Sequence, residues 1–184
     1  MRFFALIFIA LLLSGANGIA QHQEHDQNES HSSEHVECHG FRAATFIGHT
    51  LIPGPNNKKH FFIPSWGFDL EYWFSEKIGV GWHNDIELAS FVVQGPGEEE
   101  LEREYPIIST LDFLYKTKQN IVFLAGVGYE FEKEVDFFIF RFGAEMELPI
   151  GHNWDLFPTA FIDTATGERQ YYTLTLGLGV GKHF

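Results

Sequence analysis

Residues 171–184 read YYTLTLGLGVGKHF. Apolar side chains occupy the even positions 172–180, and threonine or glycine occupies the odd positions 173–181. This period-two alternation predicts a β-strand with one apolar face and one face of small or polar residues. An oily face of this length is typical of a strand that contacts lipid.

The same alternation recurs through the chain after Gly40, with turn residues between the segments. No helical periodicity interrupts it. The pattern therefore predicts an all-β fold of eight antiparallel strands. Their expected ranges are 41–52, 65–74, 78–93, 106–116, 121–132, 137–148, 154–163 and 171–184.

The N-terminus has the pattern of a secretory signal peptide. Arg2 precedes the apolar run 3–13, and small residues follow up to Ala20. We expect residues 1–20 to be removed by cleavage before Gln21, with an uncleaved short anchor as the alternative. The run is too short to cross a membrane as a helix.

Residues 21–40 form a segment of different composition. It contains five His and five acidic residues, no Lys or Arg, and Val36 as its only aliphatic side chain. Such a segment buries too little apolar surface to offset its ordering entropy, so we expect disorder. The predicted organisation is a signal peptide at 1–20, a disordered His- and acid-rich segment at 21–40 and a β-barrel at 41–184.

Charge and cysteine content exclude some classes of protein. The formal net charge of −13 argues against nucleic acid as a partner. The single cysteine, Cys38, excludes an internal disulfide framework.

The direction of the apolar faces separates two kinds of barrel. In residues 65–74, 121–132 and 137–148, one face is aromatic and aliphatic, whereas the other carries mainly Gly, Asp and Glu. A soluble barrel would have to hold all the large side chains inside eight strands, which leave little room. Apolar faces turned to lipid, with the polar faces filling a narrow lumen, fit the pattern better.

The chain resembles the small eight-stranded outer-membrane barrels of the OmpA/OmpX type over residues 41–184. The resemblance rests on the signal peptide, the alternation and the last strand with Leu176, Leu178, Val180 and Phe184. It implies an up-and-down transmembrane barrel in the bacterial outer membrane, with lipid and the barrel-assembly machinery as partners and a porin-like, non-enzymatic architecture. Lys182 departs from the pattern, where a hydrophobic residue is common.

An even number of strands places both ends of the barrel on one side, which the resemblance makes the periplasm. The periplasmic side would then carry the short turns 75–77, 117–120 and 149–153. It would also carry the His- and acid-rich segment 21–40, which we call the N-terminal arm. The connections near Asn57, Glu100, Asp136 and Gly167 would lie outside.

Counting outward from each turn predicts which side chains share the lumen. Asp69 falls opposite His83, Glu71 and Trp73 fall opposite glycines, Asp112 falls opposite Gly126, and Arg141 falls opposite Gly128. Arg141, His83 and Lys116 are the expected counter-charges for the inward carboxylates. We expect Arg141 to bridge carboxylates in a packed plug, with a cation path as the alternative. The expected inward carboxylates are Asp69, Glu71, Asp85, Glu87, Asp112, Glu130, Glu132, Glu145, Glu147 and Asp163.

The N-terminal segment also suggests metal chemistry. Imidazoles bind Zn(II) and Cu(II), a cysteine thiolate adds a soft ligand, and neighbouring carboxylates attract cations. The spacing is not that of a rigid structural zinc site, and a solvated linker of this composition is the alternative. The candidate ligands are His22, His25, His31, His35, Cys38 and His39.

Two other functions stay open. The loop GPGEEELEREY at 95–105 could serve a surface interaction or adhesion module as an acidic contact site. A lipid-modifying enzyme would need a serine and a base together, and His49, His60, Ser65 and Ser90 lie near the first outer loop. No G-x-S-x-G motif is present.

Overall fold

The structure, a computed structural model, describes residues 40–53, 60–94, 100–132, 136–166 and 171–184. The chain divides into two units, Met1–Val36 and Glu37–Phe184, and every described residue belongs to the second. The expected signal peptide, the His-rich segment and all six candidate metal ligands lie outside the described residues.

The described residues form strands joined by turns. Among them, no helix is long and apolar enough to cross a membrane. The strands are β1 (Gly40–Pro53), β2 (His60–Trp73), β3 (Ile78–Glu87), β4 (Ser90–Gln94), β5 (Glu100–Glu104), β6 (Ile107–Lys116), β7 (Ile121–Phe131), β8 (Phe137–Met146), β9 (Leu148–Gly151), β10 (Trp154–Thr166) and β11 (Tyr171–His183).

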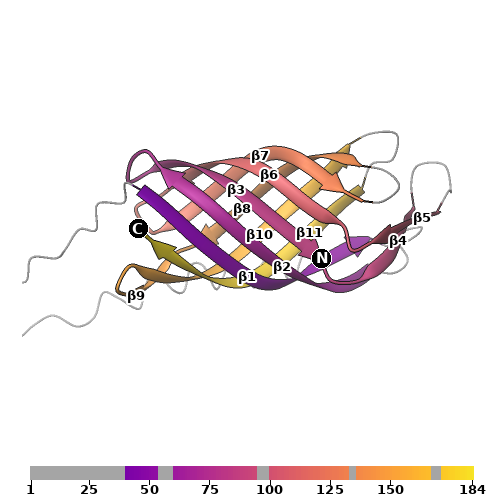
Figure 1. Cartoon of the computed structure of the whole chain (residues 1–184), viewed down its shortest axis with the longest axis horizontal. Coiled ribbons are helices and arrows are strands. Elements are labelled where there is room, and N and C mark those ends of the chain that lie inside the picture. The colour runs from indigo at the N-terminus through magenta and orange to yellow at the C-terminus, as the bar shows by residue number, and fades with distance from the viewer. Residues whose placement is uncertain (1–39, 54–59, 95–99, 133–135, 167–170) are drawn as a thin grey trace, which may run out of the picture. The chain divides into compact units, whose positions relative to one another are not determined.

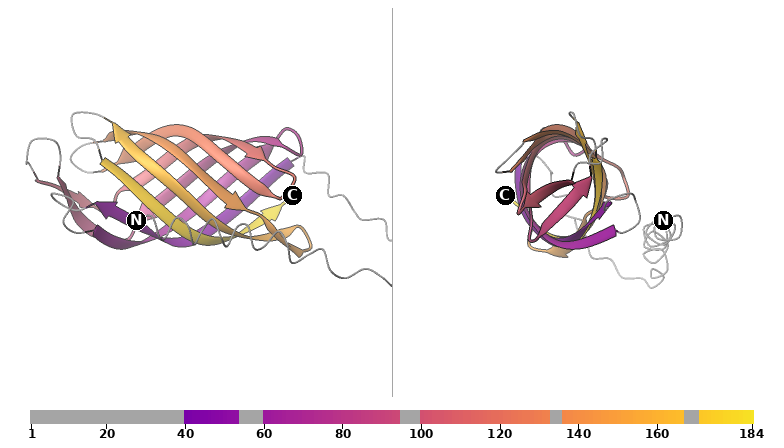
Figure 2. Two further views of the ribbon diagram at one scale, coloured as in Figure 1. Left: turned by 180° about the vertical axis from the view of Figure 1, so that it is seen from behind. Right: turned by 90° about the vertical axis from the view of Figure 1, so that its right-hand side faces the viewer.

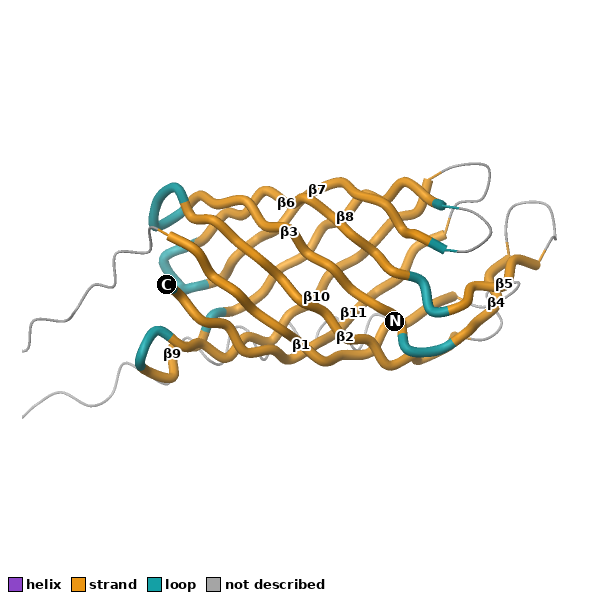
Figure 3. The backbone as a smooth tube through the Cα atoms, viewed as in Figure 1, coloured by secondary structure: helices purple, strands orange, loops and turns teal. Residues whose placement is uncertain are grey.

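Eight of these strands close into one antiparallel barrel (Figures 1 and 3). The order is β11-β1-β2-β3-β6-β7-β8-β10, and the pairing of β10 with β11 joins the two ends. Each strand pairs with its neighbours in the up-and-down sequence, so no edge of the barrel stays open. This confirms the predicted eight-stranded barrel.

The barrel has two different ends. The beginning of β1, the end of β11 and the turns at 74–77, 117–120 and 152–153 lie at the first, which we call the terminal end. The second, which we call the loop end, carries the small sheet of β4 and β5 (Figure 1).

The apolar faces point outward and the charged faces point inward. Phe142 on β8 is 60 % exposed and Leu111 on β6 is 62 % exposed, whereas Arg141, next to Phe142 in the sequence, is 1 % exposed. The same alternation appears on β2, β7 and β11. A soluble barrel would show the opposite arrangement, so the structure favours the lipid-facing alternative.

The strand boundaries differ from the sequence prediction in several places. β2 begins at His60 instead of residue 65, and β10 continues to Thr166 instead of ending at residue 163. The expected strand 78–93 is broken at residues 88–89 into β3 and β4. The expected loop after β4 contains β5, which pairs with β4 from Ser90–Glu104 to Gln94–Glu100. The expected turn at 149–153 contains most of β9, which pairs with the start of β10.

The predicted pairings next to the short turns are confirmed. Asp69 faces His83, Glu71 faces Gly81, and Asp112 faces Gly126. The pairing of Arg141 with Gly128 was wrong, because Arg141 pairs with Gly126. The ladder between β7 and β8 ends at the pair Glu130–Phe137, so the connection is two residues longer than the sequence suggested. A shift of two residues leaves every side chain on its predicted face.

Candidate functional site: the ion-paired interior

Charged side chains inside the barrel gather around three buried arginines. Each arginine contacts carboxylates on neighbouring or facing strands and lies over the ring of a phenylalanine. These clusters account for most of the charge in the interior.

Arg42 on β1 joins four strands near the terminal end. Its guanidinium pairs with Glu71 on β2, with Glu145 on β8 at 2.9 Å and with Asp155 on β10 at 2.7 Å. Its Cζ lies 4.5 Å from the ring centre of Phe157. Arg42 is fully buried, and taking its charge out of water costs free energy. The three carboxylates offset this cost.

Arg141 on β8 forms the second cluster. Its Nε and Nη2 donate to the two oxygens of Asp163 on β10, each at 2.7 Å, and it also pairs with Asp85 on β3. The guanidinium lies 4.1 Å from the ring centre of Phe161. This bidentate contact confirms that Arg141 bridges carboxylates inside the barrel.

Arg103 on β5 forms the third cluster, at the loop end. Its Nε donates to Glu130 on β7 at 2.9 Å, and its Nη1 donates to Glu132 at 2.9 Å. The guanidinium lies 4.8 Å from the ring centre of Phe137, and the hydroxyl of Tyr171 donates to Glu130. Arg103 therefore ties the small sheet to the barrel wall.

His83 on β3 forms a fourth polar contact between the arginine clusters. Its Nδ1 lies 2.7 Å from Asp112 on β6, and the same carboxylate accepts a hydrogen bond from Thr110 at 2.8 Å. Asp69 faces His83 across the β2–β3 pair. His83 thus lies between two carboxylates; the sequence predicted its position opposite Asp69, and the contact with Asp112 is added by the structure.

The interior carries more acids than bases. All ten carboxylates expected to face inward do so, and Asp155 joins them. Against these eleven, the inward bases in the described residues are Arg42, Arg103, Lys116 and Arg141, with His83 and His183 in addition. The electrostatic potential of the interior is therefore negative, which favours cations over anions.

Apolar side chains fill much of the remaining interior, so the lumen is less polar than the sequence suggested. Two buried clusters pack there, and a ring contact between Phe46 and Phe161, with centroids 5.8 Å apart, belongs to one of them. An eight-stranded barrel has room for little more than its own side chains. The first cluster comprises Ile52, Ile63, Phe91, Ile108, Phe137, Ile139, Ala165 and Tyr171. The second comprises Ala44, Phe46, Trp73, Leu114, Val122, Leu124, Phe157 and Phe161.

Two of the three arginines were missed by sequence reasoning. Arg42 lies on the same buried face of β1 as Ala44, Phe46 and Thr50. All four residues have even numbers, and this alternation in the sequence could have indicated that Arg42 faces inward. Arg103 lies in an acidic run that was interpreted as a loop. The alternation of glutamates at 100, 102 and 104 around it could have indicated a strand.

Of the candidate residues for an enzyme, His49 and Ser65 lie on opposite faces of the barrel wall. His49 points outward and stacks on Phe62 with ring centroids 5.1 Å apart, whereas Ser65 is buried on the inward face. Within the described residues, no three or more His, Cys, Asp or Glu side chains are arranged to hold a metal ion.

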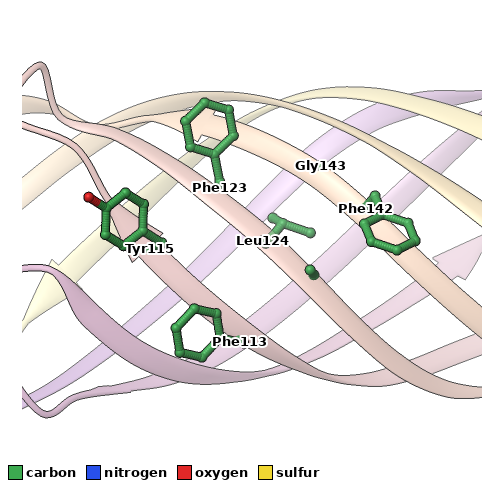
Figure 4. A pocket seen from close by; sticks show the side chains of 7 residues that line it. Phe113, Tyr115, Phe123, Leu124, Phe142 and Gly143 are labelled. Atoms are coloured by element: carbon green, nitrogen blue, oxygen red, sulfur yellow. The ribbon is translucent and has the colours of Figure 1, made fainter.

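Two depressions formed by described residues lie on the apolar exterior. One of about 300 Å³ is lined by Phe113, Tyr115, Phe123 and Phe142 around small side chains (Figure 4). Aromatic walls whose polar side-chain group is the hydroxyl of Tyr115 suit hydrocarbon chains better than a polar substrate. A larger depression, of about 670 Å³, is lined by Ile47, Gly48, His49, Pro64, Ser65, Trp66, Leu88, Leu176, Gly177 and Leu178.

A closed eight-stranded barrel with an apolar exterior and an ion-paired interior is the architecture of the small outer-membrane barrels. No protein-family model and no curated protein sequence matches the chain. Among solved structures, it is similar to the neisserial surface protein A, with a TM-score of 0.54 and 10 % identity, covering 79 % of this chain and 97 % of that one. A major outer-membrane protein of Thermus thermophilus gives a TM-score of 0.53 and 14 % identity, covering 79 % and 100 %.

The N-terminal β-barrel domain of Pseudomonas aeruginosa OprF gives a TM-score of 0.51 and 13 % identity, covering 79 % of this chain and 98 % of that one. At these identities the likeness establishes the fold and nothing finer. The fold expected from the resemblance is therefore confirmed.

Proposed function

We propose that this chain is a non-enzymatic integral protein of the bacterial outer membrane with a closed lumen. The observation that carries the proposal is the inversion of the barrel, whose exterior is aromatic and aliphatic while Arg42, Arg103 and Arg141 are buried inside. Lipid is the solvent that makes such an exterior stable. His49 faces outward and Ser65 faces inward, and this arrangement argues against the enzymatic alternative.

In this proposal the terminal end lies in the periplasm and the loop end lies outside. Lys77 and Lys118 lie in exposed turns at the terminal end, and Lys182 lies over Trp154 and Phe184 there. An aromatic ring beside a lysine is a common anchor at a membrane interface. The positions of these residues support a membrane boundary at the terminal end.

A closed lumen predicts that the refolded protein does not conduct ions. In planar bilayers we expect a flat current, because ion pairs and two apolar clusters fill the interior. A general-diffusion porin inserted by the same procedure serves as the positive control. Discrete openings that are selective for cations would contradict the closed lumen. They would instead support the alternative, in which the barrel conducts cations.

The second part of the proposal assigns transition-metal capture to the periplasmic arm at residues 21–40. The support comes from sequence, since His31, His35 and His39 recur every four residues among carboxylates and beside Cys38. Neutral imidazole and thiolate ligands favour Zn(II) and Cu(II). The barrel would hold this arm at the inner surface of the membrane.

Metal capture is tested by titration calorimetry of Zn(II) and Cu(II) into the mature protein in micelles. We expect stoichiometric binding with a dissociation constant on the order of micromolar. Exchange of His31, His35 and His39 for Asn should abolish most of the binding heat, and exchange of the barrel residues His49 and His152 for Asn should leave it unchanged. Equal heats from both variants would rule out the arm as the site.

A surface interaction module is the alternative function. Glu102 and Glu104 are exposed on β5, and Arg103 between them points inward, so the small sheet presents an acidic edge at the loop end. This arrangement suits a basic partner.

A further inference from the structure

We propose that the small sheet of β4 and β5 is a hinged lid over the loop end of the barrel and that Arg103 is its latch. In the end-on view of Figure 2 the two strands lie across the opening of the barrel. The inference concerns access to the interior from the loop end and does not depend on the metal-binding arm.

The hinge is a break in strand pairing where the small sheet leaves the barrel. The last pair of β3 and β6 is Ile86–Ile107, and the first pair of β4 and β5 is Ser90–Glu104. Three residues on one strand therefore oppose two on the other, which is the count of a β-bulge and bends the ladder. Tyr105, on the short side, has a φ of 49°. This left-handed conformation is uncommon for a residue with a side chain, and it marks a point where the chain changes direction.

The underside of the lid packs into the barrel. Phe91 on β4 is 6 % exposed and belongs to the apolar cluster that includes Ile52, Ile63 and Ala165. These residues come from β1, β2 and β10, so a single aromatic ring contacts a cluster built by several walls of the barrel. The contact seals the opening against water.

The latch is the ionic contact of Arg103. The residue is the sole base on β5, and its guanidinium is fully buried between Glu130 and Glu132. A buried arginine that loses its carboxylates is costly to keep in place. Removing either side of this contact should therefore release the lid while the barrel strands keep their pairing.

The lid has polar outer residues that do not contribute to the latch. Glu102 is exposed on β5, and no hydrogen bond or ion pair of its side chain occurs among the described residues. Glu102→Gln is therefore a matched control, since it changes the charge of the same strand without touching the barrel wall.

The test measures how fast a thiol under the lid reacts. Cys38 is changed to Ser, and Ala165, which is 1 % exposed beneath Phe91, is changed to Cys as the reporter. A second reporter, Ala44→Cys, lies in the apolar cluster of the terminal end and is 3 % exposed. The reagent is a cationic methanethiosulfonate, chosen because the interior is acidic, and it is added to the refolded protein in micelles.

We expect Arg103→Gln to speed labelling of the Ala165→Cys reporter by about tenfold or more, because a released lid exposes the thiol. The double variant Glu130→Gln and Glu132→Gln should also speed this labelling, although it leaves the sequence of the lid unchanged. Glu102→Gln should leave the labelling rate unchanged. The Ala44→Cys reporter should stay protected in every variant.

Three results would overturn the lid. Equal labelling of Ala165→Cys with and without Arg103 would show that Arg103 is no latch. Fast labelling in the Glu102→Gln control would show that any loss of charge on the strand has the same effect. Labelling of Ala44→Cys in the Arg103→Gln variant would show that Arg103 holds the whole barrel together.

Discussion

Arg141→Met is expected to lower the free energy of unfolding by about 3–5 kcal/mol, because it leaves two buried carboxylates without their cation. Asp163 accepts two hydrogen bonds from Arg141, and Asp85 accepts another from the same Nη2 atom. Methionine fills a similar volume over Phe161, so the decrease in the free energy of unfolding measures the loss of the ion pairs and not a loss of packing. Urea unfolding in micelles, followed by tryptophan fluorescence, measures the change.

Two further variants separate the ion pair from a general effect of substitution. Adding Asp85→Asn and Asp163→Asn to Arg141→Met removes the stranded charges and should restore most of the lost stability. Lys182→Met removes a cation that lies over Trp154 at the rim of the terminal end, and it should cost less than about 1 kcal/mol. If Arg141→Met itself stays within about 1 kcal/mol of the parent, the cluster does not stabilise the barrel.

The faces of the strands could be predicted from the sequence, because a side chain that changes face moves between lipid and the interior. Phe142 and Arg141 illustrate this, since the first is outward and the second inward in both the prediction and the structure. The register could be predicted only where the turn is short. The pair Asp69–His83 lies on a hairpin closed by a few residues, whereas the longer connection before Phe137 shifted the partner of Arg141 by two residues.

The lid could not be predicted, because its signals are local and weak. Residues 78–93 keep enough apolar character to suggest one continuous strand, and the bulge that breaks it depends on pairing with residues 104–107. A bulge is defined by two strands together, so the alternation of either strand alone does not reveal it. Arg103 was likewise unexpected, since its carboxylates, Glu130 and Glu132, lie on a different hairpin.

Gly126→Val is expected to prevent most of the chain from refolding. Gly126 lies between Asp112 on β6 and Arg141 on β8, where three strands meet on the inward face. A Cβ atom there would lie 2.0 Å from Asp112 Oδ1 and 2.2 Å from the carbonyl oxygen of Leu111. Backbone cannot yield as a flexible side chain does, so we expect a loss of about 3 kcal/mol or more. The folded fraction is measured by the faster migration of unheated barrel on detergent gels.

The neighbouring residue supplies the matched control, because Ala125 lies one position away on the outward face. Ala125→Val adds a side chain of the same size to the same strand, in the aromatic-walled depression of Figure 4, which has room for it. Its folded fraction should equal that of the parent. Gly126→Ala should fall between the two, since its single methyl group already meets Asp112. Equal refolding of Gly126→Val and Ala125→Val would mean that β6 and β7 are farther apart than their pairing requires, and the inward position of Asp112 would then be wrong.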